Sequence, residues 1–133
     1  MSHEARVGIV LVSHSAALAE GTAEVAGQIG GGSVAIAPAG GMDGGGIGTS
    51  IARVRQAVRQ ADGGAGVVIL PDLGSSVLTV RALLAEEDFS GPVALADAPF
   101  VEGAVAATVA AAAGGDVKAV LHAAEEARHA RKL

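Results

Sequence analysis

The stretch Val10-Leu11-Val12-Ser13-His14-Ser15-Ala16-Ala17-Leu18 decides the expected fold, because it joins an apolar run to a helical pattern. The run from Val7 to Val12 is apolar apart from one glycine and predicts a buried strand. A polar tip follows it, and Ser15 at the end of that tip is a suitable N-cap for a helix. Open α/β sheets bind their ligands at such strand-to-helix tips. We therefore expect the functional site at this edge of the sheet, with His14 in it.

The same strand-to-helix pattern recurs along the chain. Four strands that alternate with helices predict a doubly wound, mainly parallel sheet flanked by helices, and we expect a single α/β domain over residues 1–133. After the first strand, strands are expected at 33–38, 66–70 and 92–98, and helices after Thr49 or Ser50 as N-cap, after Leu73-Gly74-Ser75-Ser76, at 104–113 and after Asp116 as N-cap.

The first helix has an amphipathic pattern. Leu18, Thr22, Val25 and Ile29 recur at helical spacing, with Glu20, Glu24 and Gln28 between them. Residues three and four apart lie on one face of a helix, so this pattern predicts that the first set faces the core. Three glycines, at 30–32, end the helix.

Composition excludes several classes of protein. A net charge of −5 argues against nucleic acid or an anionic membrane as the partner, since both require clustered Lys and Arg. The chain has no cysteine, which excludes disulfides, thiolate chemistry and cysteine-based metal sites. The polar first six residues and the short apolar run behind them fit neither a secretory leader nor a membrane span. We expect a cytoplasmic protein.

The strand tips bring a small set of reactive groups to one edge. His14 could act there as a nucleophile, an acid or base, a metal ligand or a structural residue. Asp72, at the end of the third strand, could cap a turn or accept a hydrogen bond from the imidazole of His14. Ser15, Thr49 and Ser75 begin predicted helices, whose first N–H groups favour a phosphate.

The sequence contains neither the residue spacing of a metal site nor that of a nucleotide-binding loop. No arrangement of His, Asp and Glu is typical of a metal site, and we expect neither a metal nor another cofactor. The glycine-rich stretch 40–48 lacks the Gly-Lys-Ser/Thr of a P-loop and the spaced glycines of a dinucleotide site. A flexible loop or lid is the better interpretation of it.

Motifs between residues 7 and 121 together resemble the mannose-type enzyme IIA family of the bacterial phosphotransferase system. The serine after His14 and the order Gly74-Ser75-Ser76 favour the branch that serves dihydroxyacetone kinase over the sugar-transport branch. The motifs are Val12-Ser13-His14-Ser15, Gly41-Met42-Asp43 leading to Ile47-Gly48-Thr49, Asp72-Leu73-Gly74-Ser75, and Pro99-Phe100-Val101-Glu102-Gly103 followed by Ala106-Ala107.

The resemblance implies a phosphocarrier, usually a homodimer without a metal of its own. In this scheme His14 accepts a phosphoryl group from HPr and passes it to ADP held by the DhaL subunit, while DhaK presents dihydroxyacetone. Asp72 orients the imidazole, and Ser15, Thr49, Gly74 and Ser75 hold the phosphoryl oxygens.

Three alternatives remain open at this stage. One is an enzyme IIA that feeds a sugar transporter through a IIB domain. Another is a regulatory binding module controlled by phosphorylation. The third is a metal-dependent hydrolase with His14 as a ligand, for which further ligands are missing.

Overall fold

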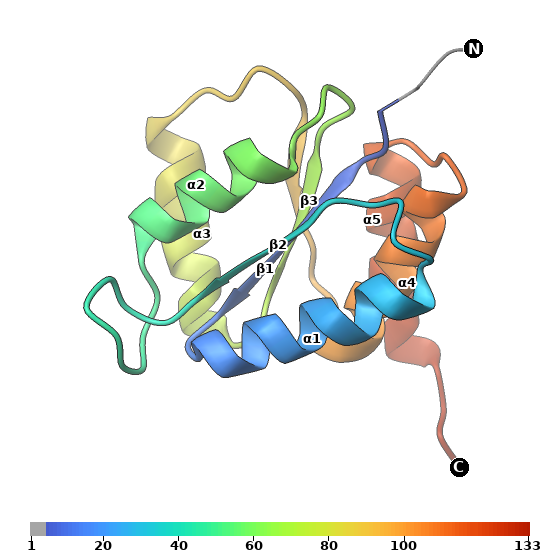
Figure 1. The fold of residues 1–133 in the computed structure, drawn as a ribbon, viewed down its shortest axis with the longest axis horizontal. Coiled ribbons are helices and arrows are strands. Elements are labelled where there is room, and N and C mark those ends of the chain that lie inside the picture. Colours follow the sequence, from blue (N-terminus) through green and yellow to red (C-terminus); the bar gives the residue numbers. More distant parts are fainter. Residues whose placement is uncertain (1–4) are drawn as a thin grey trace.

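The computed structural model describes residues 5–133, in which four parallel strands form one sheet of order β2-β1-β3-β4. Because all four strands are parallel, their carboxyl ends share one edge of the sheet (Figure 1). This confirms the predicted α/β class. Residues 1–4 of the predicted domain lie outside the part of the chain that the structure describes. The strands are β1 (Gly8–Ser13), β2 (Ile36–Gly40), β3 (Val67–Pro71) and β4 (Val93–Leu95).

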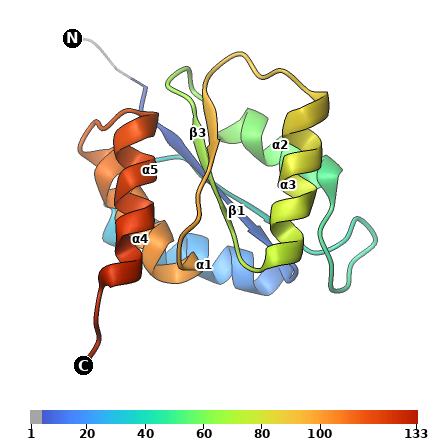
Figure 2. The same ribbon diagram turned by 180° about the vertical axis from the view of Figure 1, so that it is seen from behind.

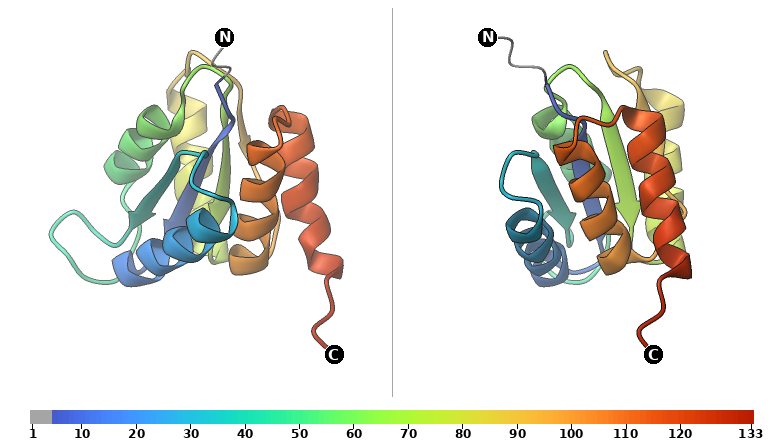
Figure 3. Two further views of the ribbon diagram at one scale, coloured as in Figure 1. Left: turned by 45° about the vertical axis from the view of Figure 1, so that its right-hand side comes forward. Right: turned by 90° about the vertical axis from the view of Figure 1, so that its right-hand side faces the viewer.

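Five helices cover the two faces of the sheet. Two of them, α2 and α3, lie on one face, and α1, α4 and α5 lie on the other (Figures 1 and 2). Views from the side show the sheet between these two layers (Figure 3). The helices are α1 (Ala16–Ile29), α2 (Ile51–Ala61), α3 (Gly74–Glu86), α4 (Phe100–Ala112) and α5 (Val117–Glu126), followed by a short 3-10 turn, η1 (Ala127–His129).

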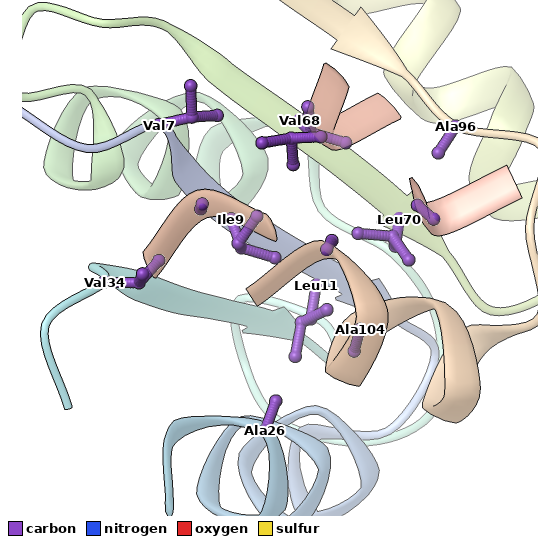
Figure 4. Packing of buried hydrophobic residues seen from close by; sticks show 13 residues of the cluster. Val7, Ile9, Leu11, Ala26, Val34, Val68, Leu70, Ala96 and Ala104 are labelled. Atoms are coloured by element: carbon purple, nitrogen blue, oxygen red, sulfur yellow. The ribbon is translucent and has the colours of Figure 1, made fainter. Parts of the chain in front are cut away.

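The alternation of side chains along β1 divides the core into two clusters. Ile9 and Leu11 pack with the α1, α4 and α5 layer, whereas Val10 and Val12 pack with α2 and α3. Figure 4 shows the first cluster, where Leu11 lies among alanine side chains from the helices, such as Ala26 and Ala104. Every residue of β1 is buried, as the apolar run predicted.

The face that α1 turns to the core matches the prediction at Thr22 and differs from it at the other three positions. Its buried residues are Ala19, Thr22 and Ala26, whereas Leu18, Val25 and Ile29 are 44%, 45% and 59% exposed. The reason is close packing: at the end of α1, a Cβ built on Gly30 would lie 2.4 Å from the side chain of Thr108 on α4. Only small side chains fit between α1 and α4 at this distance, so the larger hydrophobic residues of α1 lie on its exposed face.

Several boundaries also differ. β4 has three residues instead of the predicted seven, and α4 begins at Phe100 rather than near Ala104. Pro99 is the N-cap of α4. The negative charge of Glu102, in the first turn, interacts favourably with the positive end of the helix dipole. Ser50, not Thr49, caps α2, because its Oγ accepts the N–H of Arg53. No helix in the described residues is long and apolar enough to cross a membrane.

Candidate functional site

His14 is the first residue after β1 and lies at the carboxyl edge of the sheet, with its side chain 20% exposed. Its backbone is held from two sides. The N–H donates to Oδ2 of Asp72 at 3.0 Å, and the carbonyl accepts the N–H of Gly48 at 2.9 Å. These bonds join β1 to the tip of β3 and to the glycine-rich loop, so the position of the imidazole depends on three segments of the chain.

The imidazole lies between a carboxylate and a hydroxyl. Nδ1 is 3.0 Å from Oδ1 of Asp72, and Nε2 is 2.5 Å from Oγ of Ser75. An ionised carboxylate can only accept hydrogen bonds, so this contact assigns the hydrogen to Nδ1. Nε2 is then left with its lone pair, which accepts a hydrogen bond from Ser75.

Asp72 is almost enclosed, with its side chain 7% exposed, and it accepts hydrogen bonds from several donors. Besides the backbone and ring of His14, these are Oγ of Ser76 at 2.7 Å, Oγ of Ser13 at 3.0 Å and the N–H of Leu73 at 2.7 Å. Burial by itself raises the pKa of Asp72, but the hydrogen bonds, led by that from Ser76, outweigh burial and lower the pKa to about 2. Asp72 is therefore ionised at neutral pH.

Two helix N-termini meet at this edge. Ser15 caps α1, and its Oγ accepts the N–H of Leu18 at 3.2 Å. Gly74 and Ser75 form the start of α3, next to its N-cap Leu73. The first N–H groups of a helix have no partner within the helix and lie at its positive end, so this edge favours an anion beside Nε2 of His14.

A family model spans most of this fold and includes the whole site. The model EIIA-man, described as "PTS system fructose IIA component", matches residues 8–121. The chain belongs to the EIIA-man family. This confirms the resemblance seen in the sequence, and the EIIA-man match runs from the start of β1 into α5.

Individual relatives of this EIIA-man domain are named "PEP-dependent dihydroxyacetone kinase, phosphoryl donor subunit DhaM". The relative from Escherichia coli K12 is 39% identical over 132 residues, which cover 95% of this chain and 28% of that protein. The chain thus spans under a third of the length of the first relatives it matches. A relative from Listeria innocua, named as the corresponding subunit of kinase 2, is 30% identical and is covered over 94% of its length. A crystal structure described as a protein of unknown function has a TM-score of 0.81 at 29% identity, covering 91% of this chain and 94% of that one.

The EIIA-man fold brings most of the predicted site residues together. His14, Asp72 and Ser75 form one continuous chain of hydrogen bonds, although 58 residues separate the first two. Ser15 and Gly74 start the two helices beside them. Thr49 is different: its hydroxyl is paired with that of Thr79 on α3 at 2.7 Å, and its neighbour Gly48 makes the contact to His14.

Sequence reasoning placed Ser13 at this edge as a donor beside the imidazole, but it did not predict that Ser13 donates to Asp72, and it gave Ser76 no role. Ser13 and Ser76 are fully buried, and both donate to the carboxylate of Asp72. Ser13 also accepts the N–H of Ser15 at 3.0 Å, which links Asp72 to the start of α1. The available signals were a serine that ends an otherwise apolar strand and the spacing of four residues between Asp72 and Ser76.

The glycine-rich loop is tied to α2. Arg53 donates to the carbonyl of Gly40 at 3.0 Å and lies 3.6 Å from the carboxylate of Asp43, which also accepts a hydrogen bond from Ser50 at 2.5 Å. Gly48, with φ of +145°, then turns the chain toward the carbonyl of His14. Within residues 5–133, no three His, Cys, Asp or Glu side chains gather into a potential metal site.

Proposed function

We propose that this chain is a phosphocarrier whose His14 accepts a phosphoryl group from the phosphohistidine of HPr. The main support is the state of the imidazole. Its Nδ1 is bound to an ionised carboxylate at 3.0 Å, and its Nε2 lies at the partly exposed edge with a lone pair available. A neutral imidazole held in one tautomer is a competent nucleophile for phosphorus.

In the transfer, Nε2 of His14 attacks the phosphorus in line as the N–P bond of the donor breaks. The ring of His14 gains positive charge, and the carboxylate of Asp72 stabilises that charge while Nδ1 keeps its hydrogen. The hydroxyl of Ser75 stops donating its hydrogen bond to Nε2 and donates instead to a phosphoryl oxygen. The first N–H groups of α1 and α3, with Ser15 and Gly74, bind the remaining oxygens.

We infer that the acceptor is ADP bound in DhaL, with DhaK as the subunit that presents dihydroxyacetone. The names of relatives at 34–39% identity over 95% of the chain support this acceptor. The description of the family model as a fructose IIA component favours a second candidate, transfer to a IIB domain of a sugar transporter. The two candidates share the first step and differ in the partner that receives the phosphoryl group.

Intact-mass spectrometry tests the first step. The chain is incubated with phosphoenolpyruvate, enzyme I and HPr, and one acid-labile phosphoryl group should be added. His14→Gln should add none, whereas His122→Gln, an exposed histidine on α5, should behave as wild type. Phosphorylation of His14→Gln, or none of the wild type with active HPr, would contradict the proposal. Release of the phosphoryl group to DhaL–ADP with DhaK, compared with release to a IIB domain, then identifies the acceptor.

A further inference from the structure

Ser75 has a chemical capacity that a phosphocarrier does not require. Its side chain is exposed on the first turn of α3, and its Oγ lies 2.5 Å from Nε2 of His14. Nδ1 of the same ring lies 3.0 Å from the carboxylate of Asp72. A hydroxyl, an imidazole and a buried carboxylate connected in this order form a nucleophile, its general base and the group that orients the base.

We propose that Ser75, His14 and Asp72 form a serine-nucleophile triad that accepts the acyl group of small carboxylic esters. The proposal goes beyond the phosphocarrier function and does not depend on it. Such triads are recognised by geometry and by the roles of the three groups, not by their order in the chain. Here the order is His14, Asp72, Ser75, and the three residues come from the ends of β1 and β3 and the start of α3.

The surroundings of Ser75 supply the other parts that acyl transfer needs. Its own N–H and that of Gly74 belong to the first turn of a 13-residue helix and lack acceptors within the helix. They are donors for an oxyanion that forms beside Oγ. A cleft of about 380 Å³ is lined by Leu73, Gly74, Val77 and Leu95 together with the charged residues Arg81 and Asp97. This space beside Gly74 can hold a short acyl chain.

The reaction balances without any further reactant except water. The Oγ of Ser75 forms a bond to the carbonyl carbon, its proton moves to Nε2 of His14, and the carbonyl π pair moves to the oxygen. As the carbonyl re-forms, the ester C–O bond breaks, and the leaving alkoxide takes the proton from Nε2. Water then attacks acyl-Ser75 in the same way and releases the carboxylic acid.

Phosphoryl migration from His14 to Ser75 is a different reaction, and the geometry disfavours it. In-line displacement requires the attacking oxygen to approach phosphorus from the side opposite the leaving nitrogen. The Oγ of Ser75 lies beside Nε2 itself, so it is on the wrong side of a phosphoryl group carried there. Modification of Ser75 should therefore come from an external electrophile.

Labelling with diisopropyl fluorophosphate tests the triad without HPr or any other partner. Intact mass gives the rate, and peptide mapping gives the site of the label. We expect one label on Ser75 of the wild type and none on Ser75→Ala. His14→Gln should slow labelling about 10²-fold or more, as loss of a general base does, and Asp72→Asn should slow it at least about tenfold. Ser90→Ala, an exposed serine in the loop before β4, is the matched control and should label as wild type.

Incubation with p-nitrophenyl acetate, quenched in acid, adds a second readout, because the acetyl group should map to Ser75. The proposal is overturned if either label maps to His14 or to another serine, or if His14→Gln reacts as fast as wild type. It is also overturned if the folded wild type takes no label. These outcomes are distinct from failure of phosphoryl transfer, which is measured with HPr and does not require Ser75 as a nucleophile.

Discussion

Asp72 should link the stability of the domain to pH, and Asp72→Asn should remove that link. Hydrogen bonds hold the pKa of Asp72 at about 2 in the folded chain, against an ordinary value of 3.8. A carboxyl group with a lower pKa in the folded state stabilises folding above its unfolded pKa, and this contribution is lost as pH falls toward the folded pKa. The loss should therefore occur as pH falls from near 4 to near 2.

The magnitude follows from the two pKa values. A change from 3.8 to about 2 corresponds to about 2 kcal/mol of stability when Asp72 is ionised. From these two pKa values, about 1 kcal/mol of this stability should be lost by pH 3 and most of it by pH 2. At neutral pH, Asp72→Asn should cost about 1–3 kcal/mol, since one buried donor would face an amide NH₂ instead of an oxygen.

Urea unfolding followed by far-UV circular dichroism is the appropriate assay, because the chain has no Trp or Tyr for fluorescence. The free energy of unfolding is measured for wild type and Asp72→Asn at about pH 6 and about pH 3, and the difference between them should shrink by about 1 kcal/mol at the lower pH. Asp88→Asn, which removes an exposed carboxylate, controls for a change of surface charge. A difference that stays constant between the two pH values would refute the argument.

Three further variants test the packing and the hydrogen bonds around the site. Ser15→Ala removes the cap of α1 and should cost about 1 kcal/mol in urea unfolding; an unchanged midpoint would contradict the capping role. Gly8→Ala should lower stability by about 1–3 kcal/mol in calorimetry, since its Cβ would lie 2.1 Å from the carbonyl oxygen of Ala61; wild-type stability would contradict this close contact. Ser76→Ala removes the strongest hydrogen bond that lowers the pKa of Asp72, so that pKa should rise in a ¹³C NMR titration; an unshifted titration would exclude Ser76 as a cause.

The candidate site could be anticipated from sequence only in part. The tip after β1 and the end of β3 were visible as polar residues after apolar runs, which is why His14 and Asp72 were predicted together. The hydrogen bonds from Ser13 and Ser76 to Asp72 were not predicted, because a serine gives no local sign of whether its hydroxyl faces a carboxylate or solvent. Thr49 was expected to hold phosphate, but its hydroxyl is paired with Thr79, thirty residues away.

Features that depend on neighbours along the chain could be predicted from the sequence alone. The apolar runs predicted the four strands, and short-range capping signals such as Ser15 and Asp116 predicted where helices begin, since a cap bonds to an N–H three residues away. The tertiary structure decided which face of α1 is buried, which nitrogen of His14 carries the hydrogen, and that Asp72 is ionised. Each of these depends on groups brought together across 58 or more residues, or on how closely two helices approach. Distances of that kind are set by packing of the whole chain and have no signature in any one stretch of it.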